Sequence, residues 1–238
     1  VLDKSEPKYM NSSETPVYSK RRVLYGLNLA KKSKRPNIIL CEGNLDIVTL
    51  HQAGFDNAVA SMGTALTVEQ TRLLSRFTKE LVLCYDNDNA GKIATERALQ
   101  ILNGSEFSVK VLQLPRRLVD GEYIKQDADD FIKLQGPDAF ERLLNGSENG
   151  VEFRMAQIAG KYDLKDDEAR IAYCGEVSEL LASLPGAVER EIYTGRAAEA
   201  AGITAEAMKL EVQRSFKRRI AREKRAELRK DLNPAMAL

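Results

Sequence analysis

The sequence predicts an α/β fold in which a parallel sheet is covered by helices, followed by an all-helical part. Short apolar runs alternate with helix-like stretches through the first half of the chain. These runs are apolar throughout rather than alternately apolar and polar, which is typical of strands buried on both faces in a parallel sheet. After about residue 136 the strand-like runs stop and only helix-like stretches remain.

The predicted sheet has strands at residues 38–41, 58–61, 81–85 and 109–114. Helices are predicted between them at residues 45–53, 67–74 and 89–102. Thr67 is followed three residues later by Gln70, which is the spacing of a capping box at a helix start. Gly54 stands where a helix C-terminal cap is expected. Strands that alternate with helices in this way form parallel crossover units.

Three parts are predicted along the chain, at residues 1–36, 37–135 and 136–238. The first is a turn-rich, basic lead-in, and the second is the sheet domain. The third contains predicted helices at residues 137–145, 151–161, 166–183, 188–201 and 204–230. Its last helix is densely basic in "RSFKRRIAREKRAELRK". Because Glu223 and Glu227 are interspersed, we interpret this helix as a solvated linker rather than a nucleic-acid grip.

Composition excludes several classes of protein. The 238 residues carry a formal net charge of +1, so any phosphate contact must come from local clusters of Lys and Arg. Cys41, Cys84 and Cys174 form no CxxC pair, which favours buried, reduced thiols and a cytoplasmic protein. No apolar run approaches the roughly 20 residues that a transmembrane helix needs, so no membrane partner is expected.

Acidic residues follow three of the predicted strands, at the edge of the sheet where open α/β proteins bind ligands. Crowded carboxylates repel one another unless cations neutralise them. A set of oxygen ligands without His or thiolate suits Mg²⁺ or Mn²⁺. The sequence therefore predicts a divalent metal site here. We call these residues the acidic rim: Glu42, Asp46, Asp86, Asp88, Asp127, Asp129 and Asp130.

The stretch "DNDNAGK" fits neither of two common ligand loops. An EF-hand starting at Asp86 would need an oxygen ligand at its fifth position and Glu at its twelfth, where Ala90 and Arg97 stand. A Walker A loop would need Ser or Thr after Gly91-Lys92. Asp-x-Asp alone is a weak signal, because a helix-capping aspartate gives the same pattern.

Several motifs together resemble those of bacterial replicative primases of the DnaG family. The acidic pattern of Glu42-Gly43 with Asp46, then Asp86-x-Asp88, resembles that of Toprim domains. The motifs "KYMNSSETPVY", "LYGL", "EGNLDIVTLHQAGF", "ASMGTALT", "YDNDNAG" and "DADDFI" occur in the order and spacing of that family. The resemblance is close over residues 1–135. It implies a Toprim-type core followed by the helical part of the primase RNA polymerase domain.

The resemblance also implies roles for individual residues. Catalysis is assigned to Glu42, Asp86 and Asp88. Divalent cations would be held by Glu42, Asp86, Asp88, Asp127 and Asp129, with Asp46 supporting the rim. Nucleotides would contact Lys8, Asn11 and Lys20.

Some features depart from the family pattern or are expected to lie outside the chain. Asn44-Leu45, Asn87 and Ala128 replace residues usual in the family, but none of these changes removes a carboxylate. By resemblance, the chain is expected to lack the zinc-binding domain, most of the N-terminal lobe and the C-terminal helicase-binding domain. No zinc is therefore expected in it.

The implied function is a DNA-directed RNA polymerase that makes short RNA primers for replication. It would use ribonucleoside triphosphates on a single-stranded DNA template, with a replicative helicase as partner through the absent C-terminal domain. An alternative is a Toprim nuclease or topoisomerase fragment that cleaves DNA phosphodiesters. A further alternative is that the isolated chain only binds nucleotides, because the lobe that should hold the template is missing.

Overall fold

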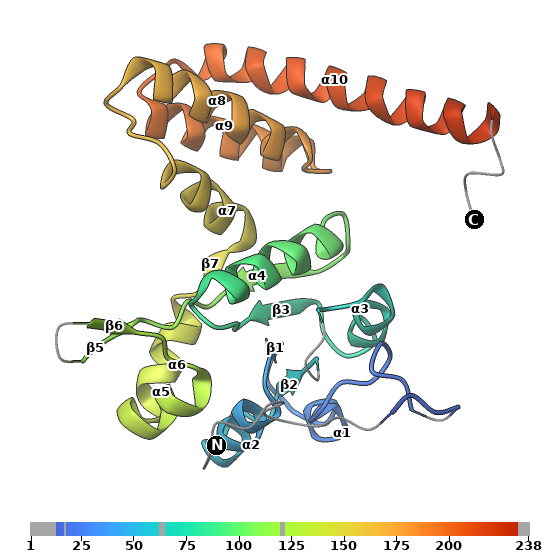
Figure 1. Cartoon of the computed structure of the whole chain (residues 1–238), viewed down its shortest axis with the longest axis vertical. Helices are drawn as coiled ribbons and strands as arrows, with labels where there is room; N and C mark the ends of the chain where they lie inside the picture. The colour runs from blue at the N-terminus through green and yellow to red at the C-terminus, as the bar shows by residue number, and fades with distance from the viewer. Residues whose placement is uncertain (1–12, 17, 62–64, 120–121, 233–238) are drawn as a thin grey trace. The chain divides into compact units, whose positions relative to one another are not determined.

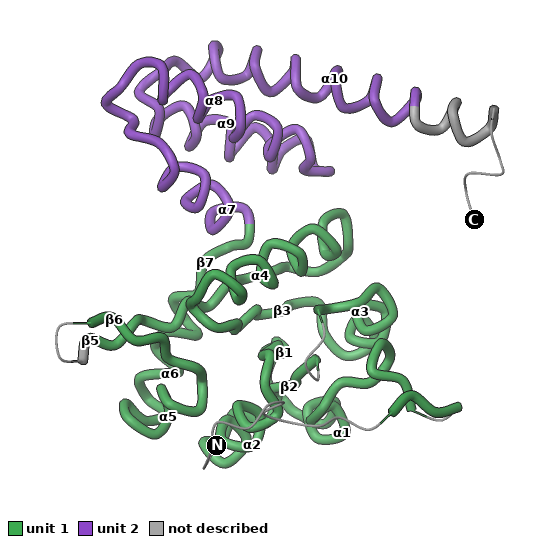
Figure 2. The backbone as a smooth tube through the Cα atoms, in the orientation of Figure 1, with its two compact units in different colours: residues 1–150 green, residues 151–238 purple. Residues whose placement is uncertain are grey.

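The chain folds into two compact units, residues 1–150 and 151–238, coloured separately in Figure 2. The computed structural model describes residues 13–16, 18–61, 65–119 and 122–232. We call residues 1–150 the sheet unit and residues 151–238 the helical unit. Figure 1 shows the elements of each.

The sheet unit contains a five-stranded sheet in the order β2-β1-β3-β4-β7. The first four strands pair in parallel, and only β7 runs antiparallel, against β4. This confirms the predicted parallel sheet with flanking helices. The strands are β1 (Asn37–Cys41), β2 (Ala58–Ala60), β3 (Glu80–Leu83), β4 (Ser108–Val111) and β7 (Glu148–Asn149). The helices are α1 (Leu27–Ala30), α2 (Asn44–Gln52), α3 (Val68–Leu74), α4 (Asn89–Leu102), α5 (Ala128–Gln135) and α6 (Pro137–Asn145).

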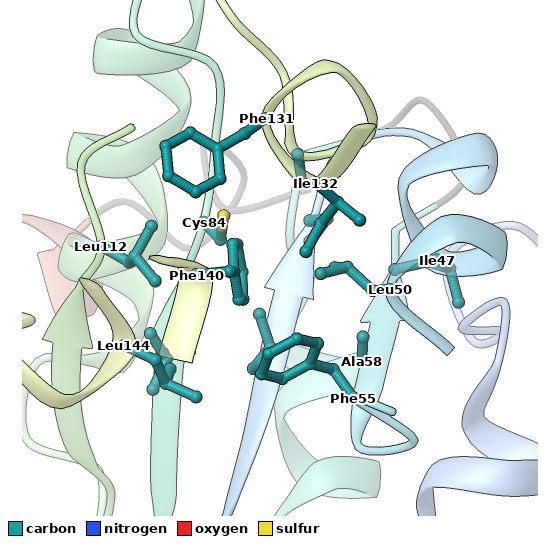
Figure 3. Packing of buried hydrophobic residues seen from close by; sticks show 14 of the residues in the cluster. Ile47, Leu50, Phe55, Ala58, Cys84, Leu112, Phe131, Ile132, Phe140 and Leu144 are labelled. Atoms are coloured by element: carbon teal, nitrogen blue, oxygen red, sulfur yellow. The ribbon is translucent and has the colours of Figure 1, made fainter. Parts of the chain in front are cut away.

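The central strands are buried on both faces because helices cover each side of the sheet. Ile39 and Val82 face a cluster formed with α2, α5 and α6, while Leu40 and Leu83, which point the other way, are equally buried. Figure 3 shows the Phe140 ring in the middle of this cluster. Its centroid lies 4.8 Å from that of Phe55. Edge-to-face packing of this kind adds to the stabilisation from burial alone.

Two parts of the sheet unit differ from the sequence prediction. Residues 115–126, where no strand is predicted, contain a two-stranded hairpin of β5 (Arg117–Val119) and β6 (Glu122–Ile124). Helix α6 was assigned to the helical part, but Phe140 and Leu144 pack in the core of the sheet unit. The units therefore separate at residue 150 rather than at 135. An amphipathic pattern shows that α6 buries one face but does not say against which core.

The helical unit contains α7 (Gly150–Ala159), α8 (Asp167–Ala182), α9 (Ala187–Ala201) and α10 (Ala205–Leu232). These positions agree with the predicted helices to within two residues. Tyr173, Val177, Ala197 and Met208 are among the side chains that form its core. In the part of the chain that the structure describes, no helix combines the length and the apolar character needed to cross a bilayer.

Candidate functional site: the acidic rim

Glu42 lies directly after β1, at the carboxyl end of the strand. Its side chain is half-buried, and its Oε1 atom is fully enclosed with no hydrogen-bond partner among the described residues. Burial raises the pKa of Glu42, and the negative charge of Asp86 raises it further. A buried carboxylate oxygen without a donor is costly, because it has lost its bonds to water. Glu42 therefore presents an oxygen that a cation would stabilise.

The turn between β3 and α4 presents the two carboxylates of "DNDNAGK". Asp88 is the N-cap of α4, and its Oδ1 atom accepts a hydrogen bond from the N–H of Gly91 at 2.8 Å. That bond is the main reason why the pKa of Asp88 is lowered. The capping alternative considered above is thus correct for one oxygen. The other oxygen, Oδ2, lies 3.1 Å from the Lys125 ammonium, so it already faces a positive charge.

Gly91 allows this turn to close, because its Cα packs against the backbone of Asp86. A Cβ at this position would lie 1.9 Å from the carbonyl oxygen of Asp86 and 3.0 Å from its nitrogen. Only glycine fits, since the obstacle is main chain rather than a flexible side chain. The Asn87 side chain supports the same turn by donating to the carbonyl of Leu114 at 2.9 Å.

Gly91→Ala is expected to lower the free energy of unfolding by about 1–3 kcal/mol, as overpacking typically does. It should also weaken divalent metal binding, because relief of the clash moves Asp86. Gly175→Ala, in the middle of α8, is the matched control, since a Cβ there meets nothing within 4 Å. That change should be neutral or stabilising by about 0.5–1 kcal/mol. Urea unfolding of both variants tests the difference, and equal stabilities would contradict the assigned role of Gly91.

Asp46 connects the starts of α2 and α5. Its Oδ2 accepts from the N–H of Gly43 and its Oδ1 from the N–H of Asp129, both at 3.2 Å. The residue is only 7% exposed. Burial is the largest cause that raises the pKa of Asp46 to about 7, and the charge of Asp127 is the next. Asp46 thus ties the start of α5, which carries the neighbouring acids, to the start of α2. Its supporting role in a metal site stays a prediction.

The first turn of α5 holds the second group of rim carboxylates. Asp127 is the N-cap of α5 and accepts from the N–H of Asp130 at 2.8 Å. Oxygens of Asp127, Asp129 and Asp130 lie within 4.8 Å of one another, close enough to share one cation. Asp129 is paired with Lys133 at 2.6 Å and bonded by the Thr49 hydroxyl.

The structure therefore places the predicted acids in two groups. Glu42, Asp86 and Asp88 interact electrostatically at the ends of β1 and β3. Asp46 lies beside the group on α5, and the negative charge of Asp86 also raises its pKa. A cavity of about 420 Å³ opens next to Glu42, with Tyr85 and Arg97 among its lining residues.

The predicted nucleotide contacts are less completely described. Lys8 and Asn11 lie outside the described residues. Lys20 is half-buried, and its main chain is fixed by bonds to Glu14 and Gln70. Its contact with nucleotides stays a prediction.

Two residues that matter for the site were not identified from the sequence. Gly91 could have been identified, because glycine disfavours a helix and its presence in the first turn of α4 therefore indicates another constraint. Lys125 could not, because its acidic partners are 39 and 37 residues away in the chain.

The donor set fits a hard divalent cation. All candidate ligands of the rim are carboxylate oxygens, and one of them is buried without a donor. Lys125 and Lys133 already occupy positions where positive charge is favourable. Oxygen-only sites of this kind bind Mg²⁺ or Mn²⁺ in preference to softer metals.

Three protein-family models match the chain. A Toprim-like model covers residues 39–132, which hold the parallel sheet and the acidic rim. A model described as the DNA primase catalytic core, N-terminal domain, covers residues 1–31. A model described as the DnaB-helicase binding domain of primase covers residues 151–206. This last match supports the predicted helicase partner. The expectation of a separate, absent C-terminal domain stays a prediction.

Known primases align over most of the chain. The DNA primase of Clostridium acetobutylicum is 39% identical over 209 residues, which is 87% of this chain and 34% of that protein. The chain thus spans about a third of the length of the curated relatives it matches. A crystal structure of a DNA primase domain from Pseudomonas aeruginosa is 32% identical with a TM-score of 0.71, covering 90% of this chain and 66% of that one.

A structure of the DnaG primase catalytic domain bound to ssDNA is also similar. It is 30% identical, with a TM-score of 0.71, over 87% of this chain and 65% of that one. The family models, the curated primases and the solved structures agree. The chain belongs to the bacterial DnaG-type DNA primase family and comprises part of the catalytic core.

Proposed function

We propose that this chain carries the metal-binding and catalytic part of a DNA-directed RNA polymerase that makes RNA primers. The observation that carries the proposal is the enclosed Oε1 atom of Glu42, which lacks a donor and stands beside Asp86 at the ends of adjacent strands. An enclosed carboxylate oxygen without a donor lowers the free energy of unfolding, so stability alone does not explain the arrangement. The arrangement becomes favourable once a divalent cation binds.

The residues of the chain have distinct tasks in this proposal. Primer synthesis joins a 3′-hydroxyl to a nucleoside triphosphate, and a bound divalent cation supplies activation of the hydroxyl and neutralisation of the phosphates. Strand ends fix Glu42 and Asp86, while the cap of α4 fixes Asp88. The raised pKa of Glu42 brings it closer to the range in which a carboxylate acts as a general base near neutral pH.

The proposed cofactor is Mg²⁺ or Mn²⁺, held by Glu42, Asp86, Asp88, Asp127 and Asp129, rather than zinc. Cys41, Cys84 and Cys174 are buried, and a hydrogen bond to Cys84 together with burial raises the pKa of the Cys41 thiol. The Nε2 atom of His51 is bonded to the carbonyl of Ala58 at 2.9 Å. The soft donors that zinc prefers are thus committed to packing or to the backbone.

The proposed substrates are ribonucleoside triphosphates and a single-stranded DNA template. Template binding is supported by the related DnaG catalytic domain that was solved with ssDNA. Triphosphate binding is assigned to Lys8, Asn11 and Lys20, whose positions match the nucleotide-contact motif. Residues 151–206 are proposed to bind a replicative helicase, which is supported by the family model that they match.

A chimaera tests the proposal. In it, this chain replaces the matching segment of the Clostridium acetobutylicum primase, so that the remaining two thirds of that protein are supplied. We expect short RNA to appear only when template, ribonucleotides and Mg²⁺ or Mn²⁺ are all present. Binding of single-stranded DNA would show that the chimaera is folded. A folded chimaera that cuts DNA and makes no RNA would favour the nuclease alternative instead.

A further inference from the structure

The β5–β6 hairpin ends with a lysine that lies against the acidic rim. Lys125 directly follows β6, and its Nζ atom is 3.2 Å from Oδ2 of Asp86 and 3.1 Å from Oδ2 of Asp88. One ammonium group thus bridges the two carboxylates of the turn after β3. These carboxylates are also the proposed ligands of a divalent cation.

Lys125 takes the oxygen of Asp88 that the fold leaves available. Oδ1 of Asp88 already accepts from the N–H of Gly91, so Oδ2 is the oxygen with more free lone-pair capacity for a cation. Lys125 bonds this Oδ2. The ammonium therefore occupies carboxylate oxygens of Asp86 and Asp88, the residues that would hold the divalent cation.

The ion pairs of Lys125 with Asp86 and Asp88 can break at low energetic cost. The Lys125 side chain is 57% exposed, while those of Asp86 and Asp88 are 24% and 34% exposed. The residues of β6 that precede it are exposed, and β6 pairs only with β5 in the described sheet. Exposed ion pairs are individually weak. Rotation of the lysine into solvent thus costs little and disturbs no core contact.

Lys133, by comparison, pairs with Asp129 within one helix at the (i, i+4) spacing. That arrangement is a local helix feature, common on solvent-facing helices. Lys125 reaches across from a different element and contacts two acids at once. Its position is therefore specific to the rim.

We propose that Lys125 is a resident counterion of Asp86 and Asp88, which a divalent cation must displace in order to bind. This inference rests on the metal site of the proposed function. An ammonium group and a divalent cation at the same two oxygens repel each other, so binding of one disfavours binding of the other. Lys125 thus neutralises Asp86 and Asp88 in the metal-free chain and lowers the affinity of the rim for the divalent cation.

Mn²⁺ binding tests the inference directly, without any measurement of synthesis. Electron paramagnetic resonance counts free Mn²⁺ during titration of the chain, its Lys125→Gln variant and its Lys125→Arg variant. Two weak ion pairs predict that Lys125→Gln binds Mn²⁺ about three- to tenfold more tightly, while Lys125→Arg stays near the parent. Lys110→Gln is the matched control. Lys110, on β4, forms its ion pair with Glu80 of β3 at 3.2 Å and not with a rim acid.

Thermal unfolding gives a second, independent measurement. In the presence of a chelator, Lys125→Gln should melt at a lower temperature than the parent, because the rim has lost its counterion. Saturating Mn²⁺ should close this gap, since the metal replaces the missing charge. Lys110→Gln should show the same difference with and without metal.

The outcomes separate this inference from the proposed function. Equal or weaker Mn²⁺ binding by Lys125→Gln would overturn the role of Lys125 and leave the metal site standing. A lack of Mn²⁺ binding by every folded variant would overturn the metal site, and the role of Lys125 with it. Tighter binding by Lys125→Gln alone would support both.

Discussion

Replacing Asp86 and Asp88 together by Asn is expected to abolish primer synthesis by the chimaera, with a loss of at least about 100-fold. Asparagine keeps the shape of each side chain but removes its charge. The cap of α4 should survive, because the amide oxygen of Asn can still accept from the N–H of Gly91. The fold is therefore expected to be retained while affinity for the metal is lost.

Single-turnover synthesis with labelled ribonucleotides measures this effect, and Mn²⁺ titration of the same variant shows its cause. Asp138→Asn is the control for a change of charge, because Asp138 is an exposed residue in the first turn of α6 and is not one of the proposed metal ligands. It should leave synthesis unchanged. Synthesis by the double variant at the parent rate would show that these carboxylates do not hold the catalytic metal.

The contribution of Asp46 to the free energy of unfolding of the metal-free chain is expected to fall by about 3 kcal/mol as the pH rises from about 4 to about 7. The cause is that its pKa is about 7 in the folded state against an ordinary 3.8. Between these values the folded chain holds a proton that the unfolded chain has released. Stability is thus greatest below the unfolded pKa and is lost as pH approaches the folded pKa. The raised pKa of Glu42 acts in the same direction.

Urea unfolding in a chelator at several pH values measures this slope. Asp46→Asn should flatten it, at the expense of one of the two hydrogen bonds that Asp46 accepts. Excess Mg²⁺ should also flatten it, because a cation at the rim favours the ionised carboxylates. A metal-free parent whose stability does not change between pH 5 and pH 8 would contradict the assigned environment of Asp46.

The sequence was sufficient to predict elements whose determinants are local. Helix α4 begins and ends at the predicted residues, and the box between Thr67 and Gln70 forms both of its hydrogen bonds. The rim was predictable because acids that follow parallel strands must meet at one edge of the sheet. Each of these inferences needed only residues close in sequence or the direction of the strands.

Among the features that escaped prediction, the β5–β6 hairpin had a local signal, because Asp120-Gly121 stands between its two strands and this dipeptide is typical of a two-residue hairpin turn. The other features depend on distant parts of the chain. The packing of α6 on the sheet unit depends on Phe55 and Phe131, which contact Phe140 only in the folded chain. The bridge from Lys125 to Asp86 and Asp88 likewise exists only after folding.

The bond from Asp46 to residue 129 has a consequence for how such proteins can diverge. Asp46 accepts from the main-chain N–H of that residue, not from its side chain. Any amino acid other than proline offers the same donor. Residue 129 can therefore be substituted while the attachment of α5 persists, and statistical covariation between positions 46 and 129 should be weak even though the two are physically joined.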